Sequence, residues 1–398
     1  MSITAILGQR TYPCQLKQGF LFSNPNKIKF IGAIFLMFMG VFGMNEVHAK
    51  LPDADPSVSQ FTLEKKGRDF AAISIHPNGD EWLFTECTTE LDPKGACYVL
   101  HYDLKTKQLK RYDLPAGYLY SYANYSPLGN YIVMSRTPKH DSSEEKIQQA
   151  IEHSEIVMMR SDGADFRVLP IDQGSKLAPF MSKDETKVAY WRSGVLRPPE
   201  SRSTSADFDI CEYDLVTKSD HLFAGPHHFF GGGNAQYVSS DEILLGSYGP
   251  GKYAQSMGEY LKKFNGSEVY KLKRKTVDLP SPSFTTIEHA RNPSVDKDGN
   301  VYLTGQPPTL GSSFARISPS GEIQYWREPI NLGLSGFRQI LASPNGRYIA
   351  FIYVAEGTNY RDQKSAFGRL ETTSSLWTPM TIPALHTAAL VPIRLATE

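Results

Sequence analysis

A set of polar side chains, most of them basic, is the best candidate in this chain for binding a ligand. They are Lys176, His227, His228, Glu288, His289, Arg291 and Arg338. Each lies near the entrance to a predicted strand, and Arg291 and Arg338 fall at equivalent positions of an internal repeat. If they converge, they form a basic mouth that holds a carboxylate or phosphate through charge-assisted hydrogen bonds. The alternative is that they are polar because they line a water-filled channel.

The same residues could bind a divalent metal, but their spacing argues against it. His227 or His228 could act with His289 and Glu288, since imidazole and carboxylate suit several metals. Adjacent histidines on a strand, however, point to opposite faces and cannot easily share one ion. The chain also lacks the H-E-x-x-H, G-x-S-x-G and P-loop motifs. We therefore predict no metal, no cofactor and no catalytic residue.

The cysteines are Cys14, Cys87, Cys97 and Cys211, and they contain no C-x-x-C motif. Cys87 and Cys97 lie at the ends of two strands that are predicted to form a hairpin. Paired residues of such a ladder have Cα atoms within the distance that a disulfide spans. We predict a Cys87–Cys97 disulfide, with two buried free thiols as the alternative, and a buried free Cys211.

Composition indicates a large all-β protein. The chain has 398 residues, with 42 Lys and Arg balancing 42 Asp and Glu, which gives no electrostatic case for nucleic-acid binding. A 40% hydrophobic and 21% charged composition is typical of a globular chain. Aromatic residues make up 12%, with 31 Gly and 26 Pro, which favours strands and turns over helices.

Residues 1–49 have the composition of a leader, which leaves 50–398 as one domain. Residues 31–44 form an uncharged apolar run that follows Lys27 and Lys29 and precedes Val47-His48-Ala49. This order is typical of a secretory signal peptide. The alternative, a retained membrane anchor, is weaker because the run is shorter than the roughly 20 residues that a spanning helix needs. We expect a periplasmic or secreted protein.

A turn motif followed by a strand with alternating apolar residues recurs along the rest of the chain. Its copies place a turn residue at positions 79, 129, 185, 240, 299 and 346. A second motif, strand–turn–strand, follows most copies, so each unit is predicted to contain four short antiparallel strands. Repeats of about 55 residues built this way predict a six-bladed β-propeller with four-stranded antiparallel blades. We expect residues 58–63 or, alternatively, residues 388–395 to complete the last blade.

The repeat resembles that of the TolB-like β-propellers, which are related to WD-repeat proteins. The resemblance is clearest in SPNGRYIAF at residues 343–351, and weakest at 182–185 and 239–241, which lack the Pro and the turn Gly. It implies a propeller of the bacterial envelope that commonly serves as a binding scaffold. It brings no catalytic motif.

The long insertions all follow the second strand of a unit, so we expect them on one face, here named the loop face. They cover residues 136–153, 192–206, 247–267, 305–313 and 355–368. Within one of them Tyr253, Met257, Tyr260 and Phe264 follow helical spacing between glycines, which suggests an aromatic lid. The alternative is an aromatic stripe that simply packs on the rim.

We therefore expect an exported, non-catalytic scaffold that docks a protein or peptide of the cell envelope on the loop face. It should be a monomer, should not bind nucleic acid, and should meet the membrane only if the leader is retained. The alternative function is a small-ligand enzyme, a lyase or hydrolase, acting at the channel mouth.

Overall fold

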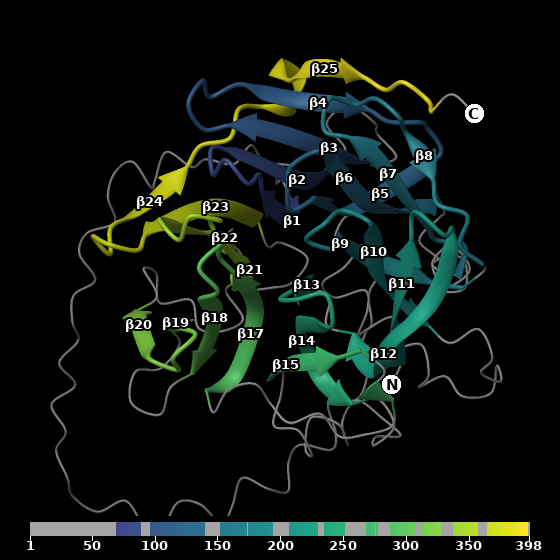
Figure 1. The fold of residues 1–398 in the computed structure, drawn as a ribbon. Coiled ribbons are helices and arrows are strands. Elements are labelled where there is room, and N and C mark those ends of the chain that lie inside the picture. The colour runs from purple at the N-terminus through teal and green to yellow at the C-terminus, as the bar shows by residue number, and fades with distance from the viewer. Residues whose placement is uncertain are drawn as a thin grey trace, which may run out of the picture.

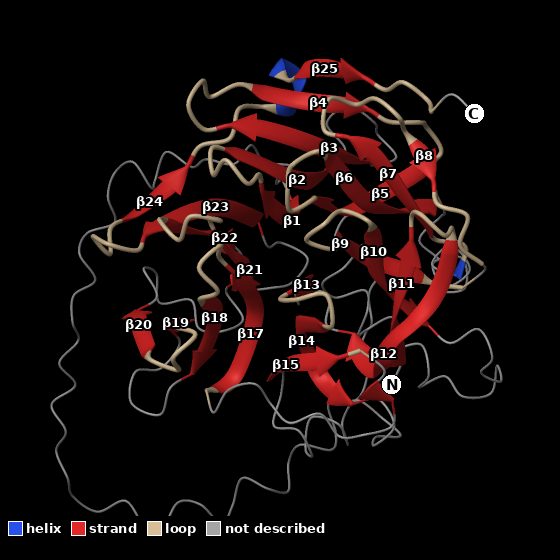
Figure 2. Cartoon of the chain, viewed as in Figure 1, coloured by secondary structure: helices blue, strands red, loops and turns tan. Residues whose placement is uncertain are grey.

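The computed structural model describes residues 69–396 and leaves several connecting segments undescribed. The segments outside the described residues are 89–95, 140–151, 173, 194–206, 230–234, 251–267, 275, 278–286, 307–312, 328–336 and 357–363. The predicted leader, the strand at 58–63 and the aromatic lid thus lie outside the described part. β-Strands dominate what is described (Figure 2), with the 3-10 helix η6 (Leu385–Thr387) near the C-terminus.

The strands form six blades that follow one another around a ring in chain order (Figure 1). Blade 1 contains β1 (Asp69–Ile75), β2 (Glu81–Thr88), β3 (Ala96–Asp103) and β4 (Leu109–Asp113). Blade 2 contains β5 (Tyr118–Tyr125), β6 (Tyr131–Pro138), β7 (Glu155–Arg160) and β8 (Arg167–Val168). Blade 3 contains β9 (Lys176–Met181), β10 (Lys187–Ser193), β11 (Asp207–Asp214) and β12 (Ser219–Phe229).

The second half of the ring follows the same plan. Blade 4 contains β13 (Ala235–Tyr237), β14 (Glu242–Pro250), β15 (Glu268–Lys273) and the short β16 (Thr276–Val277). Blade 5 contains β17 (Glu288–Val295), β18 (Val301–Gln306), β19 (Ser313–Ile317) and β20 (Ile323–Arg327). Blade 6 contains β21 (Phe337–Ala342), β22 (Tyr348–Glu356), β23 (Lys364–Glu371) and β24 (Trp377–Met380). The predicted six-bladed, all-β architecture is confirmed.

Blade 4 departs from the plan at its outer edge. β16 pairs in parallel with β12 of blade 3, whereas the outer strands of the other blades pair within their own blade. The end of β12 also pairs with β14, through His227–Pro250 and Phe229–Ser247. Blades 3 and 4 are thereby joined into one continuous sheet.

Ring closure differs from the alternative in which residues 388–395 complete the last blade, while the other alternative, residues 58–63, lies outside the described residues. Among the described residues, blade 6 has the four strands β21–β24. Residues Ala389–Pro392 do form a strand, β25, but it pairs in parallel with β4 as a fifth strand of blade 1. Figure 1 shows β25 beside β4 at the edge of the ring. The chain beyond β25 reaches blade 2, where Leu395 forms a bridge with Phe166.

Successive side chains of each strand point to opposite faces of the sheet, so each blade has two apolar faces. A buried cluster lies at every junction between neighbouring blades. In β2, Trp82 and Phe84 pack in the cluster shared with blade 6, whereas Leu83 packs in the cluster shared with blade 2. The remaining clusters join blades 2 and 3, 3 and 4, 4 and 5, and 5 and 6. The core is therefore divided among the junctions, as the period of two along a strand requires.

Candidate functional site

The chain topology brings the segments that follow second strands to one end of the ring. In every blade the second strand runs antiparallel to the first and third, so its end lies beside the start of the third. The second strands end at Thr88, Pro138, Ser193, Pro250, Gln306 and Glu356. The insertions predicted from the sequence begin at these ends, which define the loop face. The opposite end, which carries the short turns, is here named the turn face.

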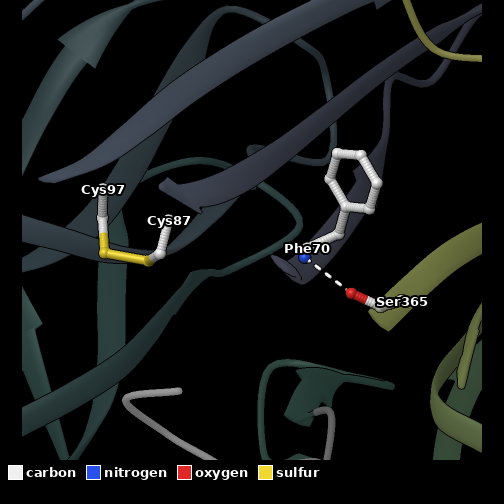
Figure 3. Close-up of a disulfide and its surroundings, with 4 residues drawn as sticks. All are labelled: Phe70, Cys87, Cys97 and Ser365. Carbon is white, nitrogen blue, oxygen red and sulfur yellow. Dashed lines mark hydrogen bonds between the residues drawn. A yellow bond between two sulfur atoms is a disulfide. The ribbon is translucent and has the colours of Figure 1, made fainter. Parts of the chain in front are cut away.

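The predicted disulfide is present at the loop face of blade 1 (Figure 3). Cys87 and Cys97 are direct partners in the ladder between β2 and β3, with Cα atoms 4.0 Å apart. Cys211 is buried and free, as predicted, and burial raises the pKa of its thiol to about 12. The disulfide closes the connection between β2 and β3 at its base.

Lys176 is buried where blade 3 begins, and its side chain faces blade 2. Its Nζ donates hydrogen bonds of 2.9 Å each to the main-chain oxygens of Asp172 and Gly174. Burial, followed by repulsion from the Arg192 guanidinium, lowers the pKa of Lys176 to about 8. The ammonium group is thus held by the link between blades 2 and 3.

His227 lies on the other side of the blade 3 sheet. It pairs with Phe208, which belongs to the core cluster between blades 3 and 4. The His227 Nδ1 lies 3.3 Å from the Ser247 hydroxyl. The His227 ring packs edge-to-face against the Tyr270 ring, with ring centroids 5.1 Å apart. Because Lys176 faces blade 2 and His227 faces blade 4, the structure does not bring these two predicted site residues together.

The remaining predicted site residues lie on two inner strands and on the end of β12. His289 and Arg291 are half-buried in β17. Glu288 lies in the same strand, Arg338 lies in β21, and His228 follows His227, but their side chains are outside what the structure describes. A basic mouth formed by His289, Arg291 and Arg338 stays a prediction.

Sequence reasoning missed a bulge that recurs in the first strand of several blades. Ala72, Tyr122, Ala178 and Asn292 all have positive φ, between 49° and 52°, and each lies at a register shift of its strand. Each also lies the same number of residues before the turn residue of its own blade, at positions 79, 129, 185 and 299. His289 adds a second such residue, with φ 54°, in β17. The available signal was proline: Pro179 and Pro293 follow two of these residues and remove a backbone N–H that the interrupted ladder would leave unpaired.

Polar side chains of these first strands join neighbouring blades around the inside of the ring. Each bond links a side chain of one blade to the main chain of the next. They are Tyr125 N–H to Ser74 Oγ at 3.0 Å, Asn124 Nδ2 to Pro179 O at 2.9 Å, Gln236 Nε2 to Val295 O at 3.3 Å, Ala342 N–H to Ser294 Oγ at 2.9 Å and Ile73 N–H to Gln339 Oε1 at 2.6 Å. The last of them connects blade 6 to blade 1 and closes the ring.

Two further observations bear on membranes and metals. Among the residues that the structure describes, no helix has the length and apolar character to cross a membrane. In the same residues, no three His, Cys, Asp or Glu side chains gather closely enough to hold a metal ion.

Comparison with known proteins places the fold among β-propellers. No protein-family model and no curated protein sequence matches the chain. The crystal structure of TolB from Acinetobacter baumannii aligns with a TM-score of 0.51 and 14% identity, over 82% of this chain and 67% of that one. The tricorn protease aligns with a TM-score of 0.50 and 10% identity over 80% of this chain, which spans only 27% of the protease.

An oligogalacturonate lyase in complex with manganese aligns less well, with a TM-score of 0.47 and 10% identity over 79% of this chain and 77% of that one. At identities this low, the alignments with TolB and the tricorn protease show a shared fold alone. The TolB-like propeller that the repeat predicts is therefore supported as a fold, while function has to be argued from the site.

Proposed function

We propose that the protein is an exported, non-catalytic scaffold that docks a protein or peptide of the cell envelope on its loop face. The observation that carries the proposal is the asymmetry of the ring: all insertions that follow second strands leave from one end. Loops held on a rigid scaffold are where binding residues concentrate in proteins. The Cys87–Cys97 disulfide, which is typical of exported proteins, fixes the base of one of these connections.

The docking face is tested by deleting one insertion and comparing capture from a bacterial envelope extract. A variant in which residues 251–267 are replaced by a short Gly-Ser linker should lose a protein that the intact chain captures. Val216→Ser is the matched control, since Val216 is 76% exposed on a turn of the opposite face. The captured protein is then purified and its affinity measured directly. Equal binding by all three chains would overturn the proposal.

The basic mouth provides a sharper test of where an acidic ligand group would bind. Arg291→Ala and Arg338→Ala should each weaken binding of the purified partner by about 2–5 kcal/mol if the guanidinium group pairs with a buried anionic group. The melting temperature should change little. Normal binding by both variants would show that these arginines only line a hydrated channel.

The alternative, a lyase or hydrolase at the channel mouth, leads to a different result. It predicts turnover of a small ligand that is lost in Arg291→Ala and kept in the variant lacking residues 251–267.

A further inference from the structure

The side of blade 2 that packs against blade 3 carries buried hydroxyl groups near the loop face. Ser135 and Thr137 lie two residues apart on β6 and therefore project from the same side of the sheet. Val133, two residues earlier, packs in the core cluster between blades 2 and 3, which identifies that side. Ser121 of β5 pairs directly with Ser135, so its hydroxyl lies on the same side.

These three hydroxyl oxygens are buried. Within the part of the chain that the structure describes, the Oγ of Ser121, the Oγ of Ser135 and the Oγ1 of Thr137 have no hydrogen-bond partner. Ser135 is 0% exposed and Thr137 is 1% exposed. Buried polar groups in folded proteins nearly always have a partner, so unpaired hydroxyls gathered on one surface indicate an occupant.

Lys176 enters the same junction from blade 3. The next residue, Leu177, packs in the cluster with blade 4, so Lys176 points to blade 2. Its main-chain N–H donates to the Oγ of Ser154, at 2.6 Å, just before β7. Lys176 is only 4% exposed, and its Nζ bonds to main-chain oxygens alone; no described carboxylate forms an ion pair with it. Three carboxylates act on it from a longer distance: Glu155 and Asp220 are ion-paired with Arg136 and Arg192, and Asp172 is exposed to solvent.

The nearest guanidinium group is already neutralised. Arg192 is the ladder partner of Lys176, and its Nη1 lies 2.6 Å from the Oδ2 of Asp220. Lys176 is therefore left without a direct ion-pair partner among the described residues of this junction. A buried charge is costly unless it is paired.

We propose that Ser121, Ser135, Thr137 and Lys176 form a binding site for a small anion between blades 2 and 3. Hydroxyl groups donate to the anion, and the ammonium group supplies the opposite charge. A water molecule would satisfy the hydroxyls but would leave the buried ammonium group without a direct ion pair, so the charge favours an anion. The site does not depend on the proposed docking function.

Bromide and acetate are the probes for this site. Crystals of the full chain grown with sodium bromide should show anomalous density between Ser135 and Thr137. In solution, bromide or acetate titrated at constant ionic strength should raise the melting temperature of the wild-type chain. A response to bromide alone assigns a halide, and a response to acetate alone assigns a carboxylate.

Variants separate binding from a general salt effect. Thr137→Val keeps the shape and Lys176→Met keeps most of the volume, and both should abolish the anion-dependent rise. Ser135→Ala, the mildest change, should weaken the affinity for the anion by about tenfold. Ser343→Ala is the matched control, because Ser343 is equally buried but already bonded to Asn345 and the amide of Tyr348.

The proposal is overturned if the density is water alone. It is also overturned if wild type, Thr137→Val and Lys176→Met respond equally to both anions. If Lys176→Met does not fold, Thr137→Val and Ser135→Ala decide the result.

Discussion

Glu185 shows how one residue can take over a glycine's role in the repeat. Blades 1, 2, 5 and 6 place a glycine with positive φ at the turn between first and second strands, and blade 3 has Glu185 with φ 57°. Its carboxylate accepts hydrogen bonds from the main-chain N–H of Leu128, at 2.9 Å, and from Asn130 Nδ2, at 2.8 Å. These bonds to blade 2 offset the strain of a left-handed residue.

Substitutions at Glu185 should therefore separate strain from bonding. Glu185→Ala keeps the strained conformation and loses both bonds, so it should lower the free energy of unfolding by about 1–3 kcal/mol. Glu185→Gly also loses the bonds but relieves the strain, so it should be about 1 kcal/mol less destabilising than alanine. Urea unfolding measures both. An alanine variant as stable as glycine would contradict this account.

At the scale of elements, the β2–β3 hairpin and β25 contribute to blade 1 in different ways. The hairpin carries the disulfide at the point where its ladder meets the loop face. β25 instead attaches to β4, which belongs to the other end of the chain, and continues onto blade 2. The hairpin forms the middle of blade 1, whereas β25 extends its outer edge.

Replacing both Cys87 and Cys97 by Ala should lower the free energy of unfolding by about 2–3 kcal/mol, because the unfolded chain regains the freedom of a short loop. Thiol titration of the denatured, unreduced chain lacking residues 1–49 should find one free thiol, from Cys211. Three free thiols would show that the bridge does not form.

Adjacent residues of β25 test whether this strand holds blades 1 and 2 together. Val391 is half-buried against the cluster between these blades, whereas Leu390 is 56% exposed. Val391→Ser should lower the free energy of unfolding by about 1–2 kcal/mol, through loss of apolar burial. Leu390→Ser should stay within about 0.5 kcal/mol of wild type. Equal effects on thermal unfolding would argue against docking of β25.

At the scale of the whole molecule, the ring closes through side chains of blades 1 and 6. Trp82, Phe84 and Phe367 share a buried cluster, and the Trp82 Nε1 donates to the Tyr348 hydroxyl at 3.0 Å. The amide of Phe70 donates to the Ser365 hydroxyl at 2.8 Å (Figure 3). Closure therefore rests on packing and hydrogen bonds across the junction, reinforced outside by β25.

Gln339→Ala should weaken this junction specifically. It leaves the buried amide of Ile73 without its 2.6 Å partner and should cost about 1–3 kcal/mol. Hydrogen exchange should speed up in β1 and β21. Gln236→Ala is the control, since its 3.3 Å bond joins blades 4 and 5. Faster exchange in β1 after Gln236→Ala as well would contradict a local effect.

The sequence by itself determined the number of blades, the loop face and the disulfide. These features follow from local chemistry: turn residues recur, apolar residues alternate along strands, and Cys87 and Cys97 flank one short connection. A residue's immediate neighbours are enough to specify them.

Only the tertiary structure decided which side chains meet. Lys176 and His227 looked like parts of one mouth, yet they lie on opposite faces of blade 3, because side-chain direction in a strand changes with each residue and with each bulge. The partner of β25 was equally hidden, since β25 and β4 are neighbours in space but come from nearly opposite ends of the described chain. Such contacts depend on how the blades pack around the ring, and no local pattern encodes that packing.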